Sequence, residues 1–296
     1  MSFDNPIFDI LCDLGVCNSQ SVTQIQPFVR DRQDINVLQC QKSGVIFLSR
    51  TDHIDLAHYD KKAPTHQYGL HKREIITTNN DTERRVQSFA NTIRGKNWLD
   101  FGAGSGAVLD RLGLLAADYA AVEPQETTAS FLSQLGHKVY RRIDSVPDSK
   151  FDVITLFHVF EHLNSPLDIL AELKKKLTPG GRLIIEVPHA RDFLISKANC
   201  RAFKEHTFWS EHLILHTRVS LTAMLQAAGL EVEAVSGIQR YPLANTLYWL
   251  ANGSSGGHIA WSQLCDNQLD RSWQSILGKM DLTDTIIAEA IMPQGL

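Results

Sequence analysis

The stretch NWLDFGAGSGAVLDRLG, residues 97–113, decides how the rest of the chain is interpreted. Its apolar start predicts a short buried strand that leads through Asp100, and glycines at every second position from Gly102 predict a tight loop before a helix. A strand, a glycine loop and a helix in this order are typical of α/β folds that hold a nucleotide-containing ligand at the carboxyl ends of parallel strands. Because Ala107 also completes the pattern G-x-G-x-x-G/A, the glycines alone leave the identity of that ligand open.

Strand and helix patterns alternate from residue 97 onward, which predicts a parallel sheet with helices on both faces. The near-continuous apolar run at residues 151–157 is typical of a strand that is covered on both sides. In the helix that follows, Ser165 is expected to cap the first turn, and a Pro-Gly-Gly segment is expected to stop the other end. We expect strands at residues 97–101, 119–123, 138–142, 151–157, 182–187, 230–235 and 284–292.

This rhythm divides the chain into four expected parts. Residues 1–85 lack strand–helix alternation and are expected to form a small accessory region, with a connecting helix that starts near Asp81. Residues 86–240 are the expected ligand-binding core, residues 241–282 a helical insertion, and residues 283–296 the last core strand. Insertions at this end of a sheet can cover a binding site.

The bulk properties favour a cytoplasmic globular protein without a nucleic-acid or membrane partner. The chain has 296 residues, a net charge of −4 and five cysteines, and its pI is about 6.3. This balance gives no basic footprint for nucleic acid. We expect neither a signal peptide nor a membrane span, because no apolar stretch approaches the ~20 residues that cross a bilayer. An odd number of widely spread cysteines argues against a disulfide framework and fits a reducing compartment.

The charge beside the glycine loop separates the candidate ligands. A pyrophosphate needs hydrogen-bond donors and positive charge, and the Asp100 carboxylate at ~4 Å would repel it by roughly a few kcal/mol. A ligand that carries an ammonium and a sulfonium reverses the sign of this interaction. Glu123 ends the next strand, about 20 residues after Gly102, and can accept both hydroxyls of a ribose in either case. The two acids together favour a cationic ligand that contains a ribose.

Five segments resemble, in order and spacing, those of class I S-adenosylmethionine (SAM)-dependent methyltransferases: LDFGAGSG, AAVEP, FDVITLFHVFEHL, KKLTPGGRLIIEVP and VSLTAMLQAAGLEV. The resemblance implies a Rossmann-like α/β fold with a seven-stranded sheet, mostly parallel with an antiparallel last strand, and SAM as the cofactor. It implies that Glu123 holds the ribose and Asp144 the adenine amino group, with Asp148 as a rival. The other residues implied to bind the cofactor are Asp100, Gly102, Ala103, Gly104 and Phe157.

The acceptor is expected beyond the fourth and fifth strands, where histidines gather. Methyl transfer needs alignment and, for a hydroxyl or a carbon acid, a base, and a histidine near neutrality suits that task. The segment TFWSEHLILHTRVSL resembles the Tyr-x-Glu-His segment of nucleotide-sugar C-methyltransferases, which implies catalytic roles for Glu211, His212 and His162. Trp209 stands at the tyrosine position and lacks its hydroxyl, which argues against methylation of carbon through a carbanion. O- and N-methyl acceptors therefore stay open.

The acceptor expected first is a small hydroxylated molecule, either a sugar or a sugar nucleotide. A macromolecular acceptor (protein or RNA), an NAD-dependent oxidoreductase and a protein that holds SAM without transfer are the alternatives. His189 is a further candidate residue. The histidines expected to serve packing or the surface are His158, His206 and His216. The tryptophans expected to form the core of the insertion are Trp249, Trp261 and Trp273.

The first cysteines resemble a zinc-binding module of two C-x-x-C pairs that often precedes such sugar enzymes. The first pair is spread to Cys12 and Cys17, and the second keeps Cys40 but has Ser43 in place of its last cysteine. Structural zinc usually takes four nitrogen or sulfur ligands, and serine is not among them. His53 could substitute, but nothing in the spacing requires it. We therefore expect a degenerate module that binds no metal.

Overall fold

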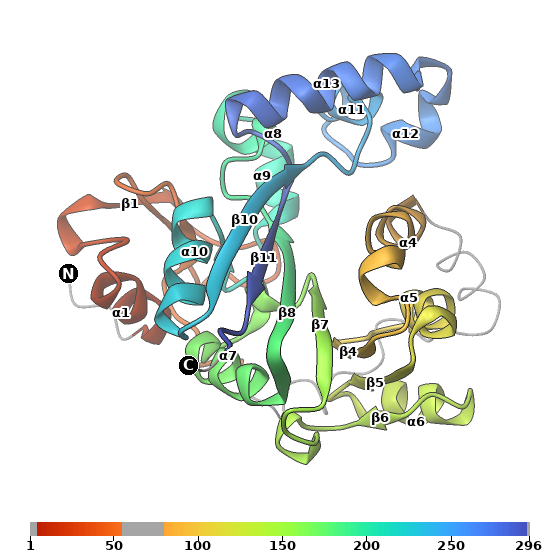
Figure 1. The fold of residues 1–296 in the computed structure, drawn as a ribbon. Coiled ribbons are helices and arrows are strands. Elements are labelled where there is room, and N and C mark those ends of the chain that lie inside the picture. Colours follow the sequence, from red (N-terminus) through yellow and green to blue (C-terminus); the bar gives the residue numbers. More distant parts are fainter. Residues whose placement is uncertain (1–4, 55–79, 295–296) are drawn as a thin grey trace.

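In the computed structural model of the chain, residues 5–54 and 80–294 are described, and a seven-stranded sheet lies at their centre (Figure 1). Its strands are β4 (Asn97–Phe101), β5 (Asp118–Val122), β6 (Val139–Tyr140), β7 (Phe151–Phe157), β8 (Leu177–Pro188), β10 (Glu231–Ile238) and β11 (Thr285–Ile291). They follow the order β10-β11-β8-β7-β4-β5-β6. Neighbours pair in parallel except around β11, which is antiparallel to both β10 and β8. The predicted Rossmann-like sheet with an antiparallel last strand is confirmed.

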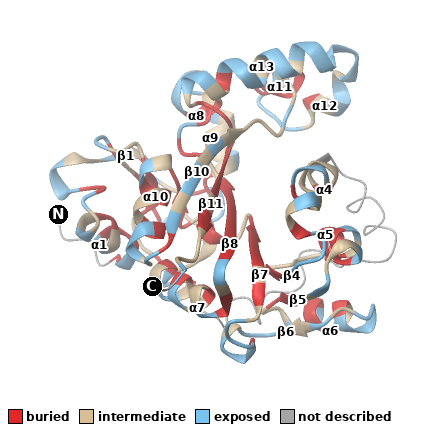
Figure 2. Cartoon of the chain, viewed as in Figure 1, coloured by how far each residue is buried: buried red, intermediate tan, exposed pale blue. Residues whose placement is uncertain are grey.

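Both faces of the sheet are covered by helices because both sides of its central strands are apolar. Trp98 packs into one hydrophobic cluster and its neighbour Leu99 into the other, as side chains of a strand alternate between faces. The helices are α4 (Asn80–Ile93), α5 (Ala107–Leu112) and α6 (Glu126–Gln134) on one face, and α7 (Pro166–Lys176) and α10 (Arg218–Ala227) on the other. Figure 2 shows the central strands buried between these layers. Within residues 5–54 and 80–294, no helix combines the length and the apolarity needed to cross a membrane.

Three local details differ from the predictions. β8 starts before the Pro-Gly-Gly segment, because the Gly180 amide donates to the Met292 carbonyl and the Met292 amide donates to the Gly181 carbonyl (3.0 and 2.8 Å). β6 is only two residues long, since Arg142 already leads into a 3-10 turn at Ile143–Ser145. Ser165 lies at the N-cap with a ψ of 68° and makes no side-chain cap hydrogen bond in the described chain. The predicted cap is therefore wrong.

The N-terminal residues form a second, smaller sheet that takes its last strand from the centre of the chain. Its elements are α1 (Pro6–Asp13), β1 (Val22–Gln26), β2 (Val37–Cys40), β3 (Ile46–Leu48) and β9 (Ile214–Leu215), in the sheet order β1-β2-β3-β9. All pairs in this sheet are antiparallel. The apolar residues of this region join the same hydrophobic cluster as α7 and α10. Residues 5–54 are thus packed against the segment around β9.

Five helices form a cap at one end of the central sheet, above the carboxyl ends of its parallel strands (Figure 1). They are α8 (Phe193–Ser196), α9 (Arg201–Thr207), α11 (Leu243–Asn252), α12 (Gly257–Ala260) and α13 (Asn267–Met280). Trp249 is buried, and the Trp273 ring meets the Phe193 ring edge-on with centroids 5.1 Å apart. The Trp273–Phe193 contact joins the two insertions, and Trp261 is half-buried against the Tyr248 ring. Of the three tryptophans expected in the core of the insertion, only Trp249 is therefore buried.

Candidate functional site

The glycine loop between β4 and α5 needs glycine for two different reasons. Gly102 has a φ of +82°, and a Cβ added there would lie 2.4 Å from Cγ2 of Val159, in the loop after β7. Gly104 has a φ of +52°, but a Cβ there would meet no described atom within 4 Å. Gly102 therefore allows close packing of two loops, whereas the face at Gly104 is open to receive a ligand.

Glu123, at the end of β5, lies directly beside this loop. Its carboxylate accepts hydrogen bonds from the Gly104 amide (2.9 Å) and the Gln125 amide (3.0 Å). The side chain is buried, and burial raises the pKa of Glu123 although both hydrogen bonds lower it. Each oxygen of a carboxylate can accept a second hydrogen bond, so Glu123 can bind two hydroxyls while it holds the loop.

Asp100 is the second buried acid at this edge of the sheet. Its carboxylate accepts a hydrogen bond from the Thr155 hydroxyl (2.7 Å), which in turn accepts one from the Trp98 indole (2.9 Å). Burial raises the pKa of Asp100 to about 6, although the Thr155 hydrogen bond lowers it. A cation beside Asp100 would offset the cost of keeping this carboxylate ionised in the interior.

The other residues expected around the cofactor lie in different surroundings. Ala103 is half-buried within the glycine loop. Phe157 ends β7, and its ring packs against Phe89 with centroids 5.5 Å apart. Asp144 is exposed and forms an ion pair with Arg142 (2.8 Å). Its rival Asp148 pairs with the Lys176 ammonium at the end of α7. The role of each of these residues stays a prediction.

A cavity of about 630 Å³ lies at the carboxyl ends of β7, β8 and β10, beneath the cap. Its lining combines polar groups from the sheet with aromatic groups from the cap. Among the lining residues are His158, His189, Asp192, His212, Arg240 and Trp249. Ligand sites of roughly 300–1,000 Å³ hold small molecules. The cavity and the glycine loop lie at the same edge of the sheet, where its parallel strands end.

Two of the predicted catalytic residues meet at the cavity. The His162 ring lies 5.1 Å from the His212 ring, measured between centroids, and its Nδ1 donates to the Glu211 carbonyl (2.6 Å). His212 Nδ1 donates to the Thr207 carbonyl (3.1 Å). Burial lowers the pKa of His212 to about 3. The Glu211 side chain is buried, whereas its backbone carbonyl holds the His162 ring in place.

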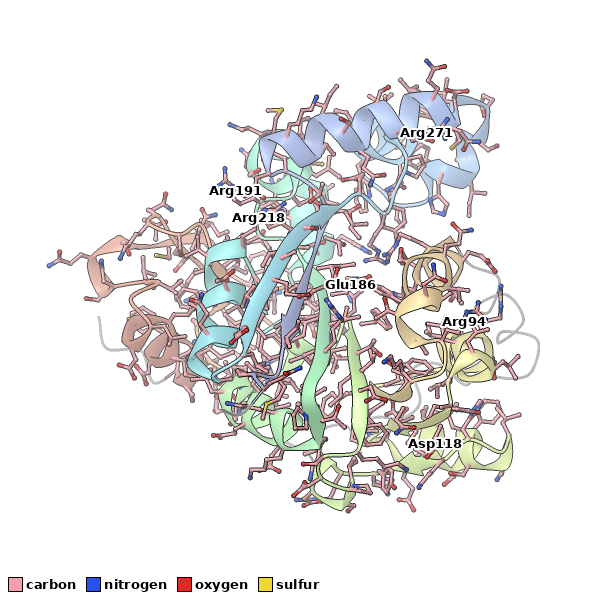
Figure 3. All side chains as sticks on the ribbon, in the orientation of Figure 1. Arg94, Asp118, Glu186, Arg191, Arg218 and Arg271 are labelled. Carbon is pink, nitrogen blue, oxygen red and sulfur yellow. The ribbon has the colours of Figure 1, made fainter. Side chains whose placement is uncertain are left out.

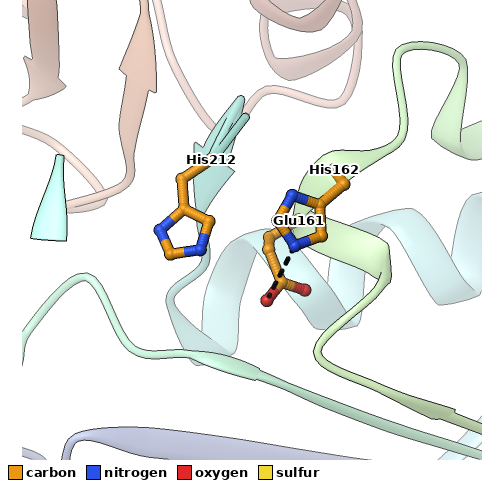
Figure 4. Close-up of side chains that lie close together, drawn as sticks. All are labelled: Glu161, His162 and His212. Carbon is orange, nitrogen blue, oxygen red and sulfur yellow. Dashed lines mark ion pairs between the residues drawn. The ribbon is translucent and has the colours of Figure 1, made fainter. Parts of the chain in front are cut away.

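Glu161 completes this group, although the sequence analysis did not single it out. Its carboxylate lies beside the two imidazoles, as Figure 4 shows, with one oxygen 3.8 Å from His162 Nε2. The side chain is fully buried. Burial raises the pKa of Glu161, but the nearby His162 and His158 more than offset this effect and bring the pKa to about 2. The ligand atoms of Glu161, His162 and His212 all lie within 4.8 Å of one another.

His158 connects this group to a charged network between β8 and α4. His158 is the first residue after β7 and has a φ of +57°. Its Nδ1 donates to the Glu161 carboxylate (3.2 Å), and its Nε2 accepts from the Arg240 guanidinium (2.9 Å). The buried carboxylate of Glu186, labelled at the end of β8 in Figure 3, accepts from Arg85 of α4 (2.6 Å). The expectation of a mere packing or surface role for His158 therefore misses its place at the cavity.

The remaining histidines divide between the core and the cavity. His216 is fully buried and stacks on Phe160 with ring centroids 5.3 Å apart, as expected for a packing residue. His189 lines the cavity, and its Nδ1 donates to the Thr283 carbonyl (3.0 Å). Burial lowers the pKa of His189 to about 4. His206 is exposed at the cavity wall, beside Trp249.

The N-terminal cysteines lie far from this cavity, in the small sheet. Cys17 Sγ and Cys40 Sγ lie 3.8 and 3.2 Å from the Ser21 hydroxyl. Burial raises the pKa of Cys17 to about 12. His53, the considered substitute ligand, donates its Nε2 hydrogen to the Ser210 carbonyl (2.7 Å). The expectation of a module that binds no metal stays a prediction.

Sequence reasoning missed residues whose role depends on burial or on distant contacts. Glu161 and His158 stand in the segment HVFEHL directly after a buried strand, and that position could have singled them out. Arg240 and Asp192 follow strands β10 and β8, but no local pattern sets them apart from surface charges. Asp192 is buried, accepts from the Leu194 amide (2.6 Å), and burial raises the pKa of Asp192 to about 8.

Comparisons with known proteins match these features. A family model described as a methyltransferase domain matches residues 72–235, more than half of the chain. The tRNA U34 carboxymethyltransferase of Colwellia psychrerythraea is 30% identical over 139 residues, 43% of this chain and 42% of that protein. The ubiquinone biosynthesis O-methyltransferase of Xanthomonas euvesicatoria is 28% identical over 169 residues, 52% of this chain and 70% of that protein. The chain therefore spans less than half the length of the tRNA-modifying relative.

Solved structures show the same architecture. The crystal structure of a SAM-dependent methyltransferase from Archaeoglobus fulgidus matches with a TM-score of 0.51 at 18% identity. The match covers 74% of this chain and 94% of that one. At this identity the likeness concerns the fold alone.

Proposed function

Because the chain belongs to the methyltransferase domain family, we propose that it transfers the methyl group of SAM to a small hydroxylated molecule bound beneath the cap. The predicted family, enzyme class and cofactor are confirmed by this membership. The observation that supports the acceptor is the cavity of about 630 Å³ at the same edge of the sheet as the glycine loop. A compact cavity with polar and aromatic walls suits a small molecule with several hydroxyls.

The residues at the glycine loop fit SAM. When bound, SAM supplies an electrophilic methyl group on a sulfonium. The open face at Gly104 would admit its methionine part, and Glu123 would accept hydrogen bonds from the ribose hydroxyls. Asp100 would favour the positive charge, because a buried carboxylate gains most from a nearby cation. Ala103, Phe157 and Asp144 are proposed as further cofactor contacts.

The residues at the acceptor side fit alignment better than strong base catalysis. His212 donates from Nδ1, so its Nε2 can accept a hydrogen bond from an acceptor hydroxyl. Because burial lowers the pKa of His212 to about 3, its ring stays neutral near neutral pH and is a weak base at Nε2. We therefore propose that His212 orients the hydroxyl, and that Glu211 keeps His162 oriented through its carbonyl.

A sugar or a sugar nucleotide is the proposed acceptor, on account of the TFWSEHL segment, of which Thr207 and His212 line the cavity. The cysteine usage supports a cytoplasmic location for this reaction. The second candidate is a tRNA, which one relative is named for. A net charge of −4 counts against it, because neutralising phosphates requires clustered lysines and arginines.

The acceptor can be tested with radiolabelled SAM and purified protein. We expect formation of S-adenosylhomocysteine and a labelled product with one or more of a panel of sugar nucleotides, and no transfer to bulk tRNA. His212→Asn should lower turnover, whereas the matched variant His137→Asn, at a histidine outside the cavity lining that contacts Asp110 of α5, should leave it unchanged. Label transfer to tRNA alone, or equal loss in both variants, would contradict the proposal.

A further inference from the structure

Glu161 carries a buried oxygen that the protein itself does not satisfy. The side chain is fully buried in the 3-10 turn Phe160–His162, and its Oε1 accepts from His158 Nδ1 (3.2 Å). Its Oε2 has no hydrogen-bond partner among residues 5–54 and 80–294. A buried carboxylate oxygen without a donor or a cation carries a large desolvation cost. Oε2 of Glu161 is therefore available to accept a hydrogen bond or to bind a cation.

The two imidazoles beside it are oriented as metal ligands are. Both His162 and His212 donate their Nδ1 hydrogens to backbone carbonyls, of Glu211 (2.6 Å) and Thr207 (3.1 Å). This fixes the tautomer of each ring and leaves Nε2 as a lone-pair donor. Metal-binding histidines show this arrangement almost always, because the second hydrogen bond holds the ring and raises its basicity.

We infer that Glu161, His162 and His212 bind one divalent transition-metal ion, with Zn²⁺ as the reference ion. Their ligand atoms lie within 4.8 Å of one another. Ligands at roughly 2.0–2.2 Å from one tetrahedral ion lie about 3.5 Å apart, so small rotations close the set. Two imidazoles and one carboxylate form a ligand set that leaves a coordination position open, as in catalytic zinc sites.

The sequence hides this site, which is why no metal ligands were expected. Glu161 and His162 follow β7, whereas His212 comes from the segment before β9, so no regular spacing joins them. The segment that carries His212 is held by the N-terminal region, because the Ser210 amide and hydroxyl both donate to Asp31 (2.9 and 2.6 Å). The site is thus assembled by tertiary structure.

The open position gives the ion a role at the acceptor. With the ion bound, His212 Nε2 is a ligand and no longer accepts a hydrogen bond from the acceptor hydroxyl. Because His212 lines the cavity, the ion in its place can bind a hydroxyl oxygen of a molecule in that cavity. This role rests on the proposed function, whereas binding of the ion does not. Measurements of metal content and of methyl transfer can therefore fail separately.

Cobalt(II) is a suitable probe, because its visible absorption reports ligand type and geometry. The protein is stripped with a chelator, dialysed and titrated with Co²⁺, and then with Zn²⁺ as a competitor. We expect one equivalent of tightly bound Co²⁺ with visible bands and without the near-ultraviolet charge-transfer band of thiolate ligands. Zn²⁺ should displace it and raise the melting temperature.

Matched variants assign the ion to its ligands. Glu161→Gln and His212→Gln should each weaken binding by at least tenfold, while His206→Gln, at an exposed histidine of the same cavity, should bind as the wild type does. Circular dichroism checks that each variant is folded. If the wild-type protein binds no stoichiometric Co²⁺, or if a thiolate band appears and Cys40→Ser abolishes it, the proposal is overturned.

Discussion

Replacement of Gly102 by alanine separates the packing role of the glycine loop from its binding role. The new Cβ would lie 2.4 Å from Cγ2 of Val159, at a backbone φ of +82°. A left-handed backbone costs an alanine about 1–2 kcal/mol, and overpacking of this kind costs about 1–3 kcal/mol more. The lower entropy of the unfolded alanine chain returns about 0.4–1 kcal/mol. We expect a loss of about 1–5 kcal/mol in the free energy of unfolding.

Gly104→Ala is the matched control, because it shares the left-handed backbone but not the collision. Its Cβ would meet no described atom within 4 Å, so only the strain and the entropy terms apply. We expect the free energy of unfolding of Gly104→Ala to be about 1–3 kcal/mol higher than that of Gly102→Ala, because the difference is the overpacking cost alone. Its methyl group should instead obstruct the open face of the loop and weaken SAM binding.

Urea unfolding and SAM titration together test this separation. The two unfolding midpoints should differ at equal slopes, with Gly102→Ala the less stable variant. In the titration, folded Gly104→Ala should bind SAM more weakly than the wild type. Equal stability of the two variants would refute the reasoning, since it would mean that the loop after β7 moves away from residue 102 at little cost.

Three further outcomes follow from buried acids. Asp192→Asn keeps the acceptor for the Leu194 amide. Because burial raises the pKa of Asp192 to about 8, the stability of the wild type relative to this variant should fall as the pH rises from 4 to 8. Urea unfolding across that pH range would show this. Glu186→Gln leaves Arg85 without its buried partner and should cost about 3–5 kcal/mol in the same assay. SAM affinity should fall as pH falls through about 6, where Asp100 becomes protonated, and Asp100→Asn should remove this dependence and weaken binding at pH 8 by about 1–3 kcal/mol, measured by calorimetry.

The sheet and the cofactor edge were predictable because their signals are local. The strand before Asp100, the glycine loop and the acid at Glu123 lie in short segments whose pattern of apolar residues determines their structure. The residue at which β8 begins was less predictable, because Gly180 pairs with Met292, more than a hundred positions away in the sequence. Ser165 has the residue type of a cap, but it lies at the N-cap with a ψ of 68° and makes no side-chain cap hydrogen bond in the described chain.

The acceptor side was only partly predictable, because its geometry comes from tertiary contacts. His162 and His212 were identified by resemblance, and the structure does bring them together. The position of Glu161 directly after a buried strand could have singled it out, but its burial could not be predicted, since burial of a charge is decided by what packs over it. Strand β9 is two residues long, too short for any periodic signal, and its pairing with β3 could not be anticipated.

The pairing of β9 with β3 ties the acceptor loop to residues outside the catalytic core. Ser210, which directly precedes Glu211 and His212, donates hydrogen bonds to Asp31 and accepts one from His53. A substitution at Asp31 or His53 is therefore expected to shift the backbone that positions His212 without touching the cavity. The small sheet and the central sheet are thus coupled through this segment, and exchange of residues 5–54 between relatives is expected to alter its geometry.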